Sequence, residues 1–255
     1  MSSQPHRTIS IRNLIAILVW PVLIALFYWQ GLWQALLSPV LSEGQALLYE
    51  QSSLIELFKD HALIILYTSL LIILTAIPLG IFVTRPSGKS FSPLLRNIAT
   101  VSQTLPPLAV LFLFLPIFGF GSKVAIFSLF LFGLMPTLQA TITGIENVDT
   151  QTIDAAKGIG LSPREIFFKV ELPLALPSIL SGLRISILLI IATAALSPMV
   201  GAESLGSPII VGFTINSTSQ ILQGAIAVAL VSIVFDFSMR TFERYVTPWK
   251  REAHS

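Results

Sequence analysis

The sequence contains no cysteine and few charged residues. The absence of cysteine among 255 residues excludes disulfides, thiolate catalysis and cysteine-based metal sites. Charged residues make up 11% of the chain and hydrophobic residues 54%, whereas about a quarter of the residues of a soluble domain are charged. The formal net charge of +2 does not indicate a nucleic-acid-binding protein. The composition therefore predicts a membrane protein.

Sequence motifs for catalysis and nucleotide binding are also absent. The chain has no G-x-x-x-x-G-K-[ST] phosphate loop, so we expect it not to bind ATP in that way. Its three histidines, His6, His61 and His254, are scattered along the sequence and form no pattern typical of metal ligands. We therefore expect no enzyme activity, no cofactor and no metal in this chain.

Long apolar segments occupy most of the sequence. A helix needs about 20 mainly apolar residues to cross a bilayer, and six segments approach that requirement. They cover about residues 14–33, 62–83, 94–118, 123–143, 176–200 and 221–237. The pattern predicts an all-α fold, a polytopic bundle of about six transmembrane helices. The helices of two segments can be broken within the membrane. One is the fifth segment, and the other is the third, which contains Pro106, Pro107 and Pro116.

The first and last parts of the chain differ from the middle. The first apolar segment follows Arg7 and Arg12 and has no clear A-x-A cleavage site, so we interpret it as a retained anchor rather than a signal peptide. We divide the chain into an N-terminal anchor with an outer segment (1–60), a transmembrane domain (61–249) and a cytoplasmic tail (250–255). Within the domain, residues 201–220 are rich in glycine and serine, which is typical of a re-entrant or half-buried outer loop.

Lysine and arginine predict the orientation in the membrane. If the N-terminus is inside, the outer segments contain only Lys59 and Lys123, and Arg184 lies near the inner face. The inner segments contain Arg7, Arg12, Arg85, Lys89, Arg96, Lys157, Arg164, Lys169, Arg240, Arg244, Lys250 and Arg251. Cytoplasmic loops are enriched in these residues. We therefore expect a multi-pass membrane protein with both termini in the cytoplasm.

The longest polar interruption runs from Thr150 to Pro173 and reads TQTIDAAKGIGLSPREIFFKVELP. We call it the elbow, because its local signals predict a helix, a sharp turn and a second helix. Asp149 or Thr150 can cap the first helix, and Gly158 and Gly160 can end it. Ser162, Pro163 and Glu165 form a start signal with a capping box, and we expect Leu172-Pro173 to stop the second helix.

The elbow resembles the cytoplasmic loop of importer-type ABC transporter permeases. Their motif reads E-A-A, three residues, G, nine residues, I, one residue, L-P. Asp154-Ala155-Ala156 occupy the first places, Gly160 follows after three residues, Val170 after nine more, and Leu172-Pro173 complete the pattern. Aspartate replaces glutamate and valine replaces isoleucine. The resemblance implies that this loop is a coupling helix that docks in a groove of the ATP-hydrolysing subunit, with these roles falling on Asp154, Ala155, Ala156, Gly160, Leu172 and Pro173.

Other stretches resemble osmoprotectant permeases for glycine betaine, choline or carnitine. They are HALIILYTSLLIILTAIPLGIFVTR (61–85), SQTLPPLAVL (102–111) and GAESLGSPIIVGF (201–213), ordered around ELPLALPSILSGLRIS (171–186). The likeness covers about residues 62–249 and is greatest to the Yeh-type betaine systems of enteric bacteria. The likeness implies a location in the lipid of the bacterial inner membrane and no nucleic-acid partner. It also implies a second permease subunit in a homo- or heterodimer, two ATPase subunits that bind ATP and Mg, and a periplasmic substrate-binding protein. Permeases for methionine or other amino acids share the elbow and stay an alternative, as does an ion-coupled secondary carrier.

The expected spans have almost no ionisable side chain near their centres. Arg184 and Asp236 are the nearest cases. We expect Arg184 to snorkel to the inner interface and Asp236 to pair with Arg240 one turn later. The polar residues that can line a pathway are Gln103, Thr104, Gln139, Thr141, Thr193, Ser197 and Asn216. For each of them taken singly, a hydrogen bond between helices is the interpretation that we favour.

Overall fold

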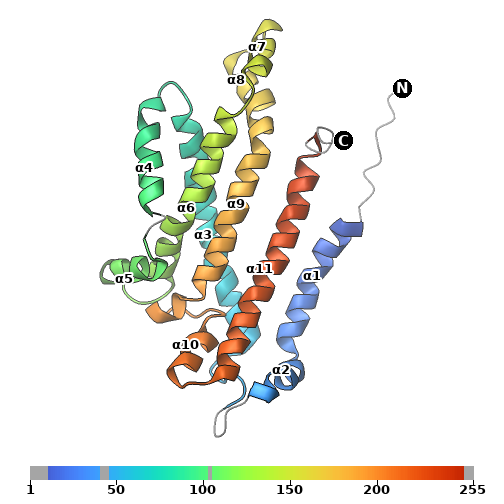
Figure 1. Ribbon diagram of the computed structural model, residues 1–255, viewed down its shortest axis with the longest axis vertical. Helices are drawn as coiled ribbons and strands as arrows, with labels where there is room; N and C mark the ends of the chain where they lie inside the picture. The colour runs from blue at the N-terminus through green and yellow to red at the C-terminus, as the bar shows by residue number, and fades with distance from the viewer. Residues whose placement is uncertain (1–10, 41–45, 103–104, 250–255) are drawn as a thin grey trace.

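The computed structural model describes residues 11–40, 46–102 and 105–249, and all its regular elements in these ranges are helical, as expected (Figure 1). The α-helices are α1 (Ile11–Tyr28), α2 (Gln30–Leu37), α3 (Leu54–Val83), α4 (Ser92–Ser102), α5 (Pro107–Phe118), α6 (Ser122–Glu146), α7 (Thr150–Gly158), α8 (Pro163–Ile166), α9 (Leu172–Ala194), α10 (Ser207–Thr214) and α11 (Thr218–Val246). A π turn, Phe167–Glu171, joins α8 to α9.

Four of the described helical segments are long and apolar enough to cross a membrane, and the bent pair α1 and α2 raises the number to five. Among the described residues this agrees with the expected bundle of about six spans, except at the third predicted segment. The third predicted segment is divided into α4 and the short helix α5 (Pro107–Phe118). Pro106 has an extended backbone (φ −61°, ψ 130°), and residues before prolines avoid the helical region. The fifth segment begins within a continuous helix that extends to Ala194, and a short 3-10 turn follows.

The helix α6 lies between α3 and α9, and these three helices make the most extensive contacts of the bundle. The helix α11 packs against α9 on one side and against α1 on the other (Figure 1). The elbow lies at the end of the molecule where α1 begins and α11 ends, and α10 lies at the opposite end (Figure 1). The fold therefore separates an elbow end from a far end.

The interface between α6 and α9 depends on small residues and hydroxyl groups. An added Cβ at Gly182 would lie 2.2 Å from Cβ of Ala140. The hydroxyls of Thr137 and Ser186 are 2.8 Å apart, and the Ser178 hydroxyl donates to the carbonyl oxygen of Ala140. Small residues let membrane helices approach closely, and hydroxyls supply hydrogen bonds between them. This interface gives the bundle its closest packing of helices.

The N-terminal helices are attached to α11. The indole of Trp20 donates to the Ser238 hydroxyl at 3.0 Å. The first predicted span bends by 71° between α1 and α2. Beyond it, the backbone N–H of Tyr49 donates to the side-chain oxygen of Gln223 at 2.8 Å. The segment before α3 is thereby held against the first turns of α11.

The predicted outer loop, residues 201–220, contains regular helical structure. It contains α10 (Ser207–Thr214), which packs on the start of α11. Leu205 is fully buried, and an added Cβ at Gly224 of α11 would lie 2.9 Å from the carbonyl oxygen of Leu205. The segment thus forms a helical hairpin with α11, a half-buried arrangement of the kind that its composition predicts.

Candidate functional site: the elbow

The first half of the elbow folds as its local sequence predicts. The Asp149 carboxylate accepts hydrogen bonds from the N–H groups of Gln151 and Thr152, so Asp149 caps α7. The helix ends at Gly158, and Gly160 has a φ of +87°. The N–H of Leu161 then donates to the carbonyl oxygen of Ala156 at 3.2 Å, which closes the end of the helix. A positive φ explains the glycine at position 160.

The second helix starts at the predicted residue. Ser162 is its N-cap, and its hydroxyl accepts from the N–H of Glu165. The Glu165 carboxylate in turn accepts from the N–H of Ser162 at 3.0 Å, which completes the capping box. Pro163 occupies the first helical position, where its missing N–H has no cost.

The expected end of this helix is wrong. Leu172-Pro173 do not stop it, and the helical path continues from Pro163 to Ala194 through the π turn. The N–H of Leu172 donates to the carbonyl oxygen of Phe167, five residues earlier. Such a wider turn takes the backbone before Pro173 out of the ordinary i→i−4 pattern, so the missing N–H and the ring of proline are accommodated. The elbow is therefore continuous with α9.

The motif residues occupy different environments within the elbow. Ala156 and Ile166, one on each side of the turn, are both buried. Asp154, Ala155 and Gly160 are exposed. Leu172 and Pro173, by contrast, are half-buried where the elbow joins the bundle. The turn and the first helix thus present the free surface, and the final residues of the motif attach that surface to α9.

Two large apolar side chains project from this otherwise polar surface. Ile159 is 78% exposed and Phe168 is 64% exposed. Their polar neighbours pair within the elbow, Lys157 with Asp154 and Lys169 with Glu165, each at 2.8 Å. Phe168 was not among the motif residues, although two consecutive phenylalanines in a charged segment are a visible signal. Exposed apolar side chains of this size are candidates for contact with a partner protein.

The elbow is also tied to the end of α3. The guanidinium of Arg85 forms an ion pair with the carboxylate of Glu171 and lies 4.5 Å from the ring centroid of Phe167. The partners are 86 residues apart in the sequence, and no local pattern indicated the pair. Its side chains are shielded, with 31% of Arg85 and 13% of Glu171 exposed.

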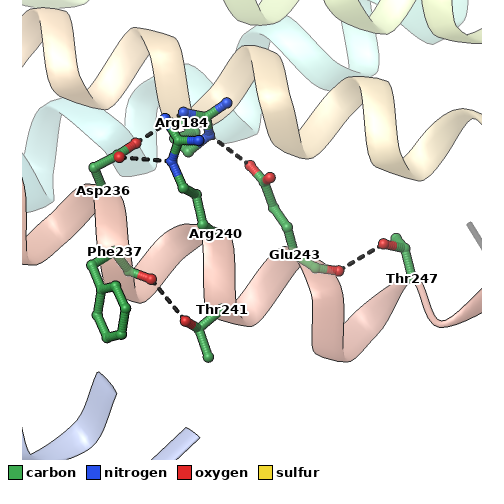
Figure 2. A network of polar contacts seen from close by, with 7 residues as sticks. All are labelled: Arg184, Asp236, Phe237, Arg240, Thr241, Glu243 and Thr247. Atoms are coloured by element: carbon green, nitrogen blue, oxygen red, sulfur yellow. Dashed lines mark hydrogen bonds and ion pairs between the residues drawn. The ribbon is translucent and has the colours of Figure 1, made fainter. Parts of the chain in front are cut away.

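A second ion cluster joins α9 to α11. Arg184 donates to Asp236 at 2.9 Å and to Glu243 at 3.0 Å, and Arg240 donates to Asp236 at 2.7 Å (Figure 2). The expected pair of Asp236 with Arg240 is confirmed. The snorkelling of Arg184 to the inner interface stays a prediction, and the structure adds that its guanidinium binds the two carboxylates of α11.

The candidate pathway residues belong to separate parts of the fold. Gln103 and Thr104 lie outside the described residues. Gln139 is half-buried and lies about 25 Å along α6 from the first residue of that helix. Thr193 lies near the last residue of α9, and its hydroxyl donates to the carbonyl oxygen of Leu189 in the same helix. Ser197 is buried in a 3-10 turn. Asn216 is exposed in the turn before α11, with a φ of +59°. Lining of a pathway by this set stays a prediction.

Comparison with known proteins defines the class. Residues 76–252 match the family described as the binding-protein-dependent transport system inner membrane component. The match covers more than half of the chain, so the protein belongs to this family. It is a permease subunit of an ABC transporter, in which ATP is hydrolysed by a separate subunit. The expectations of an all-α permease fold and of a transport subunit are confirmed.

Several curated relatives are transport permeases for small solutes. The chain is 38% identical to the choline transport system permease protein OpuBB of Bacillus subtilis (strain 168), over 74% of this chain and 86% of the relative. It is 37% identical to the osmoprotectant import permease protein OsmY of Salmonella typhimurium (strain LT2), over 78% and 84%. The glycine betaine/carnitine/choline permease OpuCB of Bacillus subtilis is 36% identical, over 74% and 86%.

Solved structures share the fold at lower identity. An inward-facing structure of the MetNI methionine ABC transporter matches with a TM-score of 0.65 and 21% identity, over 76% of this chain and 96% of that chain. An amino acid ABC transporter crystallised with histidines matches with a TM-score of 0.64 and 18% identity, over 75% and 93%. These similarities show that the helical arrangement is that of ABC importer permeases.

Proposed function

We propose that this permease moves an osmoprotectant such as glycine betaine, choline or carnitine across the bacterial inner membrane. The observation that supports the substrate class is the identity of 36% to 38% with permeases named for choline, for osmoprotectants and for glycine betaine, carnitine and choline. Glycine betaine, choline and carnitine share a quaternary ammonium group. Methionine or another amino acid is less well supported, because the structures named for those solutes are only 18% to 21% identical.

In this proposal the elbow is the contact with the ATPase subunit. Asp154, Ala155, Ala156 and Gly160 belong to its free surface, and Leu172 and Pro173 attach it to α9. Ile159 and Phe168 are the most exposed large apolar side chains of the elbow. A few anchor residues buried in a partner's pocket supply most of the binding free energy of protein interfaces. We infer that both side chains enter the groove of the ATPase.

The proposed assembly contains a second permease subunit, two ATPase subunits and a periplasmic binding protein. ATP and Mg bind to the ATPase subunits, and this chain needs neither. Residues 61–249 form the transmembrane domain, 1–60 form an anchor with an outer segment, and 250–255 form the tail. The elbow end faces the cytoplasm together with both termini, since most of the lysines and arginines of the described residues belong to segments at that end.

Uptake of labelled glycine betaine tests the substrate class. A strain without other importers of this solute should accumulate it only when the permease, its ATPase and its binding protein are produced together. Unlabelled choline or carnitine should compete, and methionine should not. Competition by methionine alone would replace the proposed class by the amino-acid alternative. Uptake into liposomes by the purified permease alone, driven by an ion gradient, would favour a secondary carrier.

Single-cysteine labelling tests the orientation, and the natural absence of cysteine makes each label unique. We expect cysteine at the exposed residue Ser162 to react with an impermeant reagent only after the membrane is opened. Cysteine at the exposed residue Gln51, before α3, should react in intact spheroplasts, as should cysteine at Gln45, which lies outside the described residues. The reverse pattern would place the elbow on the outer side.

A further inference from the structure

Arg85 occupies a rigid connection between two helices. It is the second residue after α3, and its N–H donates to the carbonyl oxygen of Phe82. The carbonyl oxygen of Arg85 accepts from Gly88 at 3.0 Å and from Lys89 at 2.9 Å. An added Cβ at Gly88 would lie 2.2 Å from the carbonyl oxygen of Phe82, so the turn is folded tightly onto the end of α3. A force on the Arg85 side chain is therefore transmitted to α3 and, through this turn, to α4.

The side chain of Arg85 contacts both ends of the π turn. Phe167 is the first residue of that turn and Glu171 is the last. The guanidinium lies over the ring of Phe167 and pairs with the carboxylate of Glu171. A planar guanidinium can stack and form an ion pair at the same time, which a lysine ammonium does less well. One side chain thus spans the whole turn from outside.

The π turn is the point at which the helix from Pro163 to Ala194 departs from regular geometry. It has the wider hydrogen bonding described above, and Pro173 follows it without an N–H. Departures of this kind are where helices bend. A displacement of the elbow by a partner would therefore bend the helix at this turn unless another contact resists the bend.

We propose that Arg85 is a coupling residue: it braces the π turn and transmits movement of the elbow to α3 and α4. The ion pair and the ring contact join the elbow to the end of α3, so the elbow, α9 and α3 move together. Without the brace, the turn bends and the movement is absorbed locally. This inference rests on the proposed docking of the elbow on an ATPase, and it does not depend on which solute is carried.

Lys169 provides a matched control within the same turn. It is a cationic residue that lies between Phe167 and Glu171 in the sequence, and its ammonium pairs with Glu165 at 2.8 Å. That partner belongs to the elbow itself, and the Lys169 side chain is 62% exposed. Its removal therefore deletes an ion pair from the π turn and leaves the link to α3 in place.

The test measures solute moved per ATP hydrolysed in proteoliposomes that contain the full complex, with labelled glycine betaine and the binding protein. We expect Arg85→Ala to lower this ratio about tenfold, within the range usual for coupling between sites, with ATP hydrolysis and ATPase co-purification near wild type. Lys169→Ala should keep the wild-type ratio. The charge exchange R85E/E171R should restore part of the ratio lost in Arg85→Glu, and Arg85→Lys should give an intermediate value.

Three outcomes would overturn the inference. One is a wild-type ratio in Arg85→Ala. Another is an equal loss in Arg85→Ala and Lys169→Ala. The third is a loss of uptake and hydrolysis in the same proportion together with a lower amount of protein, which indicates a structural role only. Failure of the wild-type complex to move glycine betaine, choline and carnitine would instead refute the substrate class. The ratio would then be measured with the solute that the complex does move.

Discussion

Helix α9 contacts two of its neighbours, α6 and α11, in different ways. Towards α6 it places Gly182 and Ser186, which allow close approach and a hydroxyl contact. Towards α11 it places Arg184, which binds Asp236 and Glu243. Lipid tails are as apolar as leucine, so apolar surface alone gives little drive for helices to associate in a bilayer. The first interface should therefore be sensitive to side-chain volume and the second to charge.

The largest expected effect comes from adding volume at the interface with α6. In Gly182→Ala the new Cβ would lie 2.2 Å from Cβ of Ala140 and 2.9 Å from the carbonyl oxygen of Pro136. We expect a loss of about 3 kcal/mol of stability, the upper part of the usual range for overpacking, measured by thermal unfolding in detergent. Gly158→Ala is the control, because its Cβ would meet nothing within 4 Å. Equal melting temperatures for both variants would show that α6 and α9 can move apart enough to accommodate the added methyl group.

The next effect comes from removing the charge at the interface with α11. Arg184→Gln leaves Asp236 and Glu243 without their shared partner. Loss of one partner costs about 3–5 kcal/mol for a fully buried pair. We expect about 2 kcal/mol here, because these side chains are 16% to 27% exposed.

A double-mutant cycle sharpens this prediction. Glu243→Gln in the Arg184→Gln background should cost less than in the wild type, since the carboxylate is already unpaired. Strictly additive losses would show that Arg184 and Glu243 do not interact in the membrane.

A smaller effect on stability is expected at the turn of the elbow, outside both interfaces. Gly160 has a positive φ, but an added Cβ would meet nothing within 4 Å. The expected cost of Gly160→Val therefore comes from the backbone, where a residue with a Cβ loses about 1–2 kcal/mol at positive φ. We expect normal insertion and abundance but severely reduced transport and ATPase co-purification. Normal uptake at wild-type abundance would remove the turn from its proposed role.

The smallest effect is expected for an ion pair on the free surface. Lys157→Ala removes the contact with Asp154, in which both side chains are more than half exposed. Such pairs on helix surfaces contribute about 0.3–0.5 kcal/mol, so the melting temperature should change little. A fall in melting temperature as large as that of Arg184→Gln would show that exposure does not explain the difference between this surface pair and the Arg184 cluster.

The parts of the elbow that sequence reasoning predicted correctly depend on neighbouring residues. The caps by Asp149 and Ser162 and the positive φ at Gly160 each involve groups within a few positions. The predicted stop at Leu172-Pro173 was also a local argument, and it was wrong. The rule for proline assumes a regular α-helix, whereas the π turn changes the hydrogen bonding immediately before Pro173.

The ion pairs between different helices were beyond sequence reasoning. Arg184 lies 52 residues from Asp236 and 59 from Glu243. From sequence alone, Arg184 had no visible partner, and snorkelling was the cheapest arrangement for an isolated charge. Phe168 was missed for the same reason: the exposure of a side chain depends on which faces of the elbow the bundle covers.

The sequence by itself determined the class of this protein. Scarce charge and long apolar segments require helices that satisfy their own backbone hydrogen bonds in lipid, and the residues from Asp154 to Pro173 place the chain among ABC importer permeases. Only the tertiary structure decided how the elbow is connected: as a continuous extension of α9, braced by Arg85 from α3, with α9 itself held to α11 through Arg184. The physical reason is that hydrogen bonds within a helix are local, whereas a charge in the bundle takes the partner that folding brings within reach.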